Sequence, residues 1–96
     1  MNTVFALGLA ALSYGQHTYK PPAGYVPNAR TAIRIAEAVL EPIYGRATID
    51  RQRPLVARLR GGEWIVQGTL GTSKGGVALI KISKDDGRVL RVTHGK

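Results

Sequence analysis

The side chains that could perform acid–base catalysis are few and widely spaced in this 96-residue sequence. The two histidines are His17 and His94, and a carboxylate partner for His94 could only come from Glu37, Asp85 or Asp86. General acid–base catalysis needs a titratable group within hydrogen-bond reach of the reacting proton. Nothing in the spacing brings these residues together. We therefore interpret His94 as a surface histidine near a strand end, and we predict no catalytic residue.

The remaining candidate motifs lack residues that their chemistry requires. Ser73 has no G-x-S-x-G context, and its loop, Gly71–Gly76, lacks the G-K-[ST] ending of a phosphate-binding loop. Asp85-Asp86-Gly87 is followed by Val89–Arg91, where a calcium loop needs further oxygen ligands. The sequence contains no cysteine, which excludes disulfides and thiolate ligands. We predict that the protein binds no metal and no cofactor.

The net charge of +8 comes from 14 Lys+Arg against 6 Asp+Glu. Such a balance indicates either a solvated basic surface or an acidic partner. The basic residues are dispersed, without a continuous run and without a row of stacking aromatics. A continuous basic run and a row of stacking aromatics are typical of nucleic-acid-binding proteins, and this chain has neither. We therefore do not expect it to bind nucleic acid.

Residues 1–15 form an apolar N-terminal segment whose nine-residue run Val4–Leu12 is too short to span a bilayer. Small residues before Gln16 match a signal-peptide cleavage site, although the usual positive start is missing. The alternative is an apolar segment packed on the domain. We expect a periplasmic or exported protein if residues 1–15 act as a signal peptide, and a cytoplasmic one otherwise. Residues 16–27 form a Pro-rich extended leader, which Tyr19 and Tyr25 are expected to anchor.

A single main helix is predicted to begin after Asn28, a favourable N-cap, and to run to Glu41 before Pro42 breaks or kinks it. Gly45 is expected to close the terminal turn, and Arg34 to pair weakly with Glu37. Helical spacing predicts an inner face made of Ala32, Ile35, Ala36, Val39 and Ile43.

Four short alternating runs follow a polar connection in which Ile49 is the expected anchor. Gly61-Gly62 is a strong hairpin signal. Alternation predicts an inner face made of Leu55, Ala57, Leu59, Trp64, Val66, Gly68, Leu70, Ala78, Ile80, Ile82, Leu90 and Val92. The predicted fold class is therefore α+β, with one helix packed on a four-stranded antiparallel meander.

The opposite sheet face has no second helix to cover it. It carries Arg58, Arg60, Gln67, Thr69, Lys81, Arg91 and Thr93, together with Val56, Ile65 and Leu79. We predict that this face docks a protein partner, although one β-bulge would invert part of the list. The predicted partner-binding residues are Arg58, Arg60, Gln67, Lys74, Lys81 and Arg91.

Several segments together resemble a known family. They are Gly24–Asn28, Ala32–Ala38, Pro42–Gly45, Trp64–Leu70, Gly75–Ala78, Ile82–Lys84 and Asp86–Lys96. Over residues 24–96 the sequence resembles a bacterial immunity-protein family with a nuclear-transport-factor-2-like fold, found beside polymorphic-toxin and Rhs-type loci. The resemblance implies a minimal cystatin-like or nuclear-transport-factor-2-like domain at residues 28–96.

The resemblance also implies a non-enzymatic protein that binds a cognate toxin and neutralises it by occlusion. No catalytic residue carries over, and toxin contacts cannot be transferred because each immunity protein matches its own toxin. Two alternatives remain open. One is a PepSY-like envelope or peptidase-associated binding module, and the other is a small enzyme of the cone-shaped fold superfamily.

Overall fold

The computed structural model describes residues 17–71 and 75–95, and it contains two helices and one sheet in those ranges. The helices are α2 (Ala29–Tyr44) and α3 (Arg46–Asp50). The strands are β1 (Val56–Arg60), β2 (Glu63–Gln67), β3 (Ala78–Ser83) and β4 (Val89–His94), paired antiparallel in the order β1-β2-β3-β4. The predicted α+β meander is confirmed. The proposed signal peptide at 1–15, Ser73 and Lys74 lie outside the described residues.

Helix α2 begins where its cap is satisfied. The side-chain oxygen of Asn28 accepts a hydrogen bond from the backbone N–H of Thr31 at 2.9 Å, and Gly45 closes the other end with φ +95° and an N–H bond to the carbonyl of Glu41. Both caps were predicted. The helix nevertheless continues through Pro42 to Tyr44. Proline in the last turn removes only one intrahelical hydrogen bond, so the expected break at Pro42 is wrong.

Replacing Asn28 by alanine is expected to lower the free energy of unfolding by about 1 kcal/mol, because the Thr31 N–H loses its acceptor. Asn28→Asp keeps a side-chain oxygen at the cap and should retain most of the stability. Urea unfolding followed by the fluorescence of Trp64, the single tryptophan, measures both. Equal stability of Asn28→Ala and the natural protein would contradict this role.

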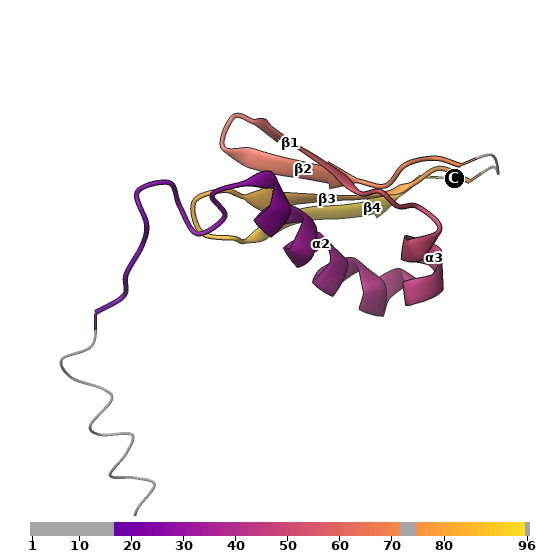
Figure 1. The fold of residues 1–96 in the computed structure, drawn as a ribbon, viewed down its shortest axis with the longest axis horizontal. Coiled ribbons are helices and arrows are strands. Elements are labelled where there is room, and N and C mark those ends of the chain that lie inside the picture. The colour runs from indigo at the N-terminus through magenta and orange to yellow at the C-terminus, as the bar shows by residue number, and fades with distance from the viewer. Residues whose placement is uncertain (1–16, 72–74, 96) are drawn as a thin grey trace, which may run out of the picture.

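The helix buries a narrow line of residues spaced four apart: Ala32, Ala36 and Leu40. Ile35 and Val39 are only partly buried, and Ile43 is exposed, so the predicted inner face is wrong at Ile43. The two alanines allow the helix backbone to approach the sheet closely. Figure 1 shows both helices on one side of the sheet.

The sheet face beneath α2 forms the rest of the core. Its buried residues follow the predicted alternation in the two central strands: Trp64, Val66, Ala78, Ile80 and Ile82. Ile49 on the short helix α3 is fully buried against them, as predicted. The register places Val66 opposite Ile80, and Ile80 opposite Val92. One continuous apolar layer therefore holds the helix against the sheet.

Three residues predicted for the inner face are exposed at the margins of the sheet. A bulge between Lys81 and Ile82 pairs Ile82 with Val89, which leaves Leu90 exposed. Leu59 lies at the hairpin end of an edge strand and is 47% exposed. Leu70 follows the last residue of β2, so strand alternation no longer applies to it, and it is 57% exposed.

The leader is held by backbone contacts rather than by its tyrosines. Tyr25 and Val26 donate N–H bonds to the carbonyls of Asp85 and Lys84, at 2.9 and 3.0 Å. Gly24 has φ +88°, and a Cβ there would lie 2.4 Å from the Lys84 carbonyl oxygen, so glycine is required for this approach. Val26 is buried, whereas Tyr19 and Tyr25 are exposed; the tyrosine anchors were predicted wrongly. Figure 1 shows this leader meeting the sheet beside the β3–β4 turn.

Candidate functional site

The sheet surface away from α2 is the principal candidate site, and we call it the open face. Strand register aligns Arg58 with Ile65, Ile65 with Lys81, and Lys81 with Arg91, so these four residues form one row across all four strands. The next row contains Val56, Gln67, Leu79 and Thr93. A third row joins Arg60, Glu63 and Ser83.

The structure thus brings together five of the six predicted partner-binding residues: Arg58, Arg60, Gln67, Lys81 and Arg91. The sixth, Lys74, lies outside the described residues. Membership of one face followed from strand parity. Which of these residues lie next to each other depends on the strand register. The bulge between Lys81 and Ile82 falls just beyond the row, so Arg91 stays on its predicted side of the sheet. Their role in binding a partner stays a prediction.

The open face carries four cations, Arg58, Arg60, Lys81 and Arg91, against one carboxylate, Glu63. Lys81 and Arg91 are direct cross-strand partners. Like charges placed opposite each other destabilise a sheet. Repulsion between Lys81 and Arg91 therefore lowers the stability of the free protein, and an anionic partner bound to this surface would reduce that repulsion.

The other five carboxylates are already paired elsewhere. Arg53 holds three of them, Glu37, Glu41 and Asp50, between the helices and the start of β1. Hydrogen bonds to Glu37 and then to Asp50 raise the pKa of Arg53. The predicted Arg34–Glu37 pair is not formed, because Glu37 bonds to Arg53 instead. These three acidic groups are therefore gathered on the helix side, away from the open face.

The remaining two carboxylates lie in the β3–β4 turn. Asp85 pairs with Lys20 at 2.7 Å, and this hydrogen bond raises the pKa of Lys20. Asp86 accepts the backbone N–H of Arg88 at 3.0 Å, which is the main cause of its lowered pKa. Since the acids that could have paired with His94 have these other partners, the structure forms no His94–carboxylate couple among the described residues.

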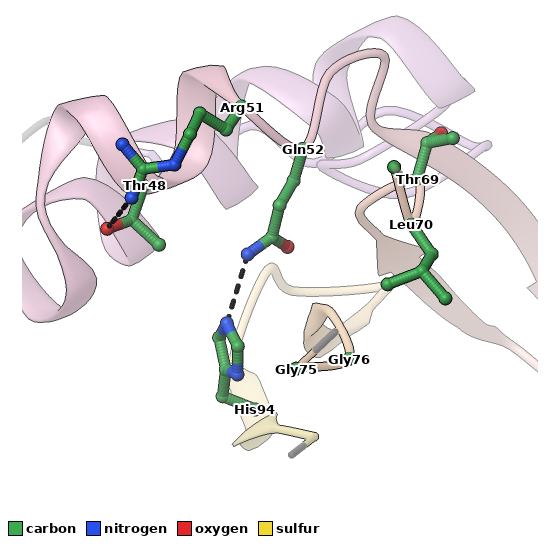
Figure 2. Close-up of a pocket in the computed structure, with 9 residues that line it drawn as sticks. Thr48, Arg51, Gln52, Thr69, Leu70, Gly75, Gly76 and His94 are labelled. Carbon is green, nitrogen blue, oxygen red and sulfur yellow. Dashed lines mark hydrogen bonds between the residues drawn. The ribbon is translucent and has the colours of Figure 1, made fainter. Parts of the chain in front are cut away.

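A second, polar hollow of about 260 Å³ lies between α3, the end of β2 and the end of β4. Figure 2 shows the side chain of Gln52 pointing from the α3–β1 connection toward His94. Gln52 is 8% exposed. Its Oε1 accepts the backbone N–H of Ala78 at 2.7 Å, and its Nε2 lies 3.0 Å from His94 Nε2. The His94 ring also packs on Tyr44, with centroids 5.0 Å apart.

These contacts assign the hydrogen-bond roles of the two His94 ring nitrogens. The Ala78 N–H can only donate, so the amide oxygen of Gln52 must face it and the amide nitrogen must face His94. His94 Nε2 therefore accepts, and Nδ1 carries the proton and donates to the Gly95 carbonyl at 2.7 Å. Both ring nitrogens are occupied within the protein, so His94 ties the end of β4 to the α3–β1 connection.

Sequence reasoning missed Gln52, which stands between two arginines in what was predicted to be a polar connection. The Gln52 side chain lies directly against Gly68. A Cβ at Gly68 would lie 2.4 Å from Gln52 Oε1 and 2.7 Å from Gln52 Cβ. The only sequence signal was thus a glycine inside a strand pattern, which often marks a close approach. Trp64, in contrast, is core as predicted, and its Nε1 donates to the Val26 carbonyl at 2.8 Å.

Within residues 17–71 and 75–95, no group of three or more His, Asp or Glu side chains could hold a metal ion. In the same ranges, neither helix is long and apolar enough to cross a bilayer.

Comparison with known proteins gives two matches. The model of a family described as NTF2 fold immunity protein matches residues 31–96. A protein of Escherichia coli (strain K12) named "Uncharacterized protein YhhH" is 33% identical over 86 residues, which cover 88% of this chain and 65% of the relative. The chain thus spans about two thirds of that relative's length. No solved structure matches the chain.

Proposed function

Because the chain belongs to the NTF2 fold immunity protein family, we propose that it protects a bacterial cell by binding one cognate toxin of a polymorphic-toxin system. The role of an immunity protein is non-catalytic: it binds the toxin and neutralises it. The family supports this role in general, and the open face supports a mechanism of occlusion, in which the sheet covers a functional surface of the toxin.

The observation that carries the mechanism is the excess of positive charge on the open face. Arg58, Lys81 and Arg91 lie in one row of the open face, whereas the carboxylates outside that face are paired on the helix side or in a turn. A rigid sheet presents this row without reordering the backbone. Complementary charge speeds encounter and suppresses wrong partners. We therefore infer that the toxin surface bound by this protein is acidic.

The direct test is co-expression with the toxin encoded beside the chain's own gene. Growth should be restored by the natural protein, and the purified pair should form a complex. If the natural protein neither restores growth nor binds that toxin, the proposed function fails.

Reversing two charges of the row, Arg58→Glu with Lys81→Glu, is expected to raise the dissociation constant of that complex at least about 100-fold, because attraction becomes repulsion. Protection should be lost while the fold is kept, since both side chains project from the sheet surface. Binding is measured by calorimetry at two salt concentrations, because the natural complex should weaken with added salt.

The matched control reverses two exposed arginines of α2, Arg30→Glu with Arg34→Glu. Each double variant reverses two charges and lowers the net charge by four units, from +8 to +4. A long-range effect of net charge would weaken both variants equally. Docking through the open face requires that the α2 variant still protects, and equal losses in the two variants would contradict it.

A further inference from the structure

Ile65 is an unusual member of the open face. It lies in the middle of the cationic row, with Arg58 opposite on β1 and Lys81 opposite on β3. Despite this position on an uncovered surface, it is only 6% exposed. Long basic side chains cover neighbouring apolar surface with their methylene stems while their charged ends stay in water. The row therefore combines a buried apolar centre with positive charge on both sides.

Next to Ile65 the surface sinks into a hollow of about 340 Å³, which we call the Ile65 hollow. It is lined by Val56, Arg58, Ile65, Gln67, Thr69 and Leu70, with the backbone of Gly68. Val56 and Leu70 are 53% and 57% exposed, so apolar surface beside Ile65 is in contact with water. Leu70 reaches this position because β2 ends at Gln67 and the chain then leaves strand geometry.

We propose that the Ile65 hollow receives one apolar side chain of the toxin, best an aromatic one, and that acidic residues flanking this side chain bind Arg58 and Lys81. This proposal rests on the proposed function and specifies the chemistry of its partner. A hollow of this volume is at the small end of the range of ligand pockets, roughly 300–1,000 Å³. It suits one side chain, and interface energy is concentrated in such anchors, surrounded by a polar rim.

The charged residues around the Ile65 hollow determine the charge of the toxin segment whose apolar side chain can enter it. Arg58 lines the hollow itself, and Lys81 lies one strand beyond Ile65. Among the described residues, the only carboxylate on the open face is Glu63, in the row of Arg60. A toxin cleft that binds nucleic acid is positive, because it must neutralise phosphates. Such a cleft would be repelled by this rim, so the anchored segment belongs to an acidic surface.

Three capped heptapeptides test this chemistry on the full chain by methyl and amide NMR titration. The first has a central phenylalanine with three Asp or Glu residues on each side. The second replaces the phenylalanine by alanine, and the third keeps the phenylalanine but has lysine flanks. The first peptide should shift the methyl signals of Val56, Ile65 and Leu70, with a dissociation constant at least about tenfold lower than that of the alanine peptide. The lysine peptide should cause no shifts at the hollow.

Leu70→Asp places a carboxylate at the edge of the hollow without touching the core, and it should abolish the preference for phenylalanine. Leu59→Asp is the matched control, since Leu59 is also exposed but belongs to the other sheet face. The proposal is overturned if the phenylalanine and alanine peptides bind equally, or if their shifts map outside the hollow.

The same two variants separate this proposal from the proposed function. If the natural protein restores growth beside its toxin and Leu70→Asp does so equally well, the anchor is wrong and the immunity role stands. If Leu70→Asp alone loses protection while Leu59→Asp keeps it, both are supported. If the natural protein fails to protect, the immunity role fails whatever the peptides do.

Discussion

Replacing Leu40 by alanine is expected to lower the free energy of unfolding by about 2–5 kcal/mol. Leu40 is fully buried where α2 lies on the sheet, so the truncation removes apolar contacts and leaves a cavity that the rigid sheet cannot close. A domain of this size has a total stability of only about 5–15 kcal/mol. The variant should therefore unfold at clearly lower denaturant concentration, measured by Trp64 fluorescence in urea.

The control for Leu40→Ala is the same truncation at Leu59, which is 47% exposed on an edge strand. It removes the same atoms but creates no enclosed cavity, so its effect should be well below that of Leu40→Ala. If the two variants lose equal stability, the helix–sheet contact at Leu40 does not hold the core together as described.

The second large effect is expected at Gln52. Replacing it by leucine keeps a side chain of similar size but removes the acceptor for the Ala78 N–H and the donor for His94 Nε2. An unsatisfied buried polar group costs about 1–3 kcal/mol. We expect a loss in that range from urea unfolding. The nitrogen-15 NMR signals of the His94 ring should also change, because Nε2 no longer has a donor facing it.

Nitrogen-15 NMR of the natural protein at alkaline pH should show a protonated Nδ1 and an unprotonated Nε2 in His94, and Gln52→Leu should disturb this pattern. Gln67→Leu provides the comparison, since Gln67 is a half-buried glutamine on the open face. A stability loss at Gln67→Leu as large as that at Gln52→Leu would argue against the Gln52 contacts.

Sequence patterns located most of the elements and the membership of each face. The alternation over Ala78–Ile82 and the caps at Asn28 and Gly45 were predicted because each depends on neighbours within a few residues. Strand alternation predicted the residues of the open face in the same way. The errors at Leu59, Leu70 and Leu90 lie where a strand ends, borders the sheet or carries a bulge, and alternation alone does not contain that information.

The contacts that sequence reasoning missed join residues far apart in the chain. Gln52 bonds to residues 26 and 42 positions away, and Trp64 donates to the carbonyl of Val26 over 38 positions. Arg53 collects carboxylates from both helices. No local propensity distinguishes these residues from ordinary loop residues, because their partners are set by how the helix docks on the sheet.

By itself, the sequence determined an α+β meander and the basic residues that share its open face. Those properties depend on short-range sterics, alternation and composition. Only the tertiary structure decided that Arg58, Lys81 and Arg91 share one row around Ile65, that Leu70 helps to line a hollow beside them, and that Gln52 is buried against His94. Strand register and helix docking determine these contacts, because each brings together residues that are far apart in the sequence. No single segment of the chain contains the information that fixes them.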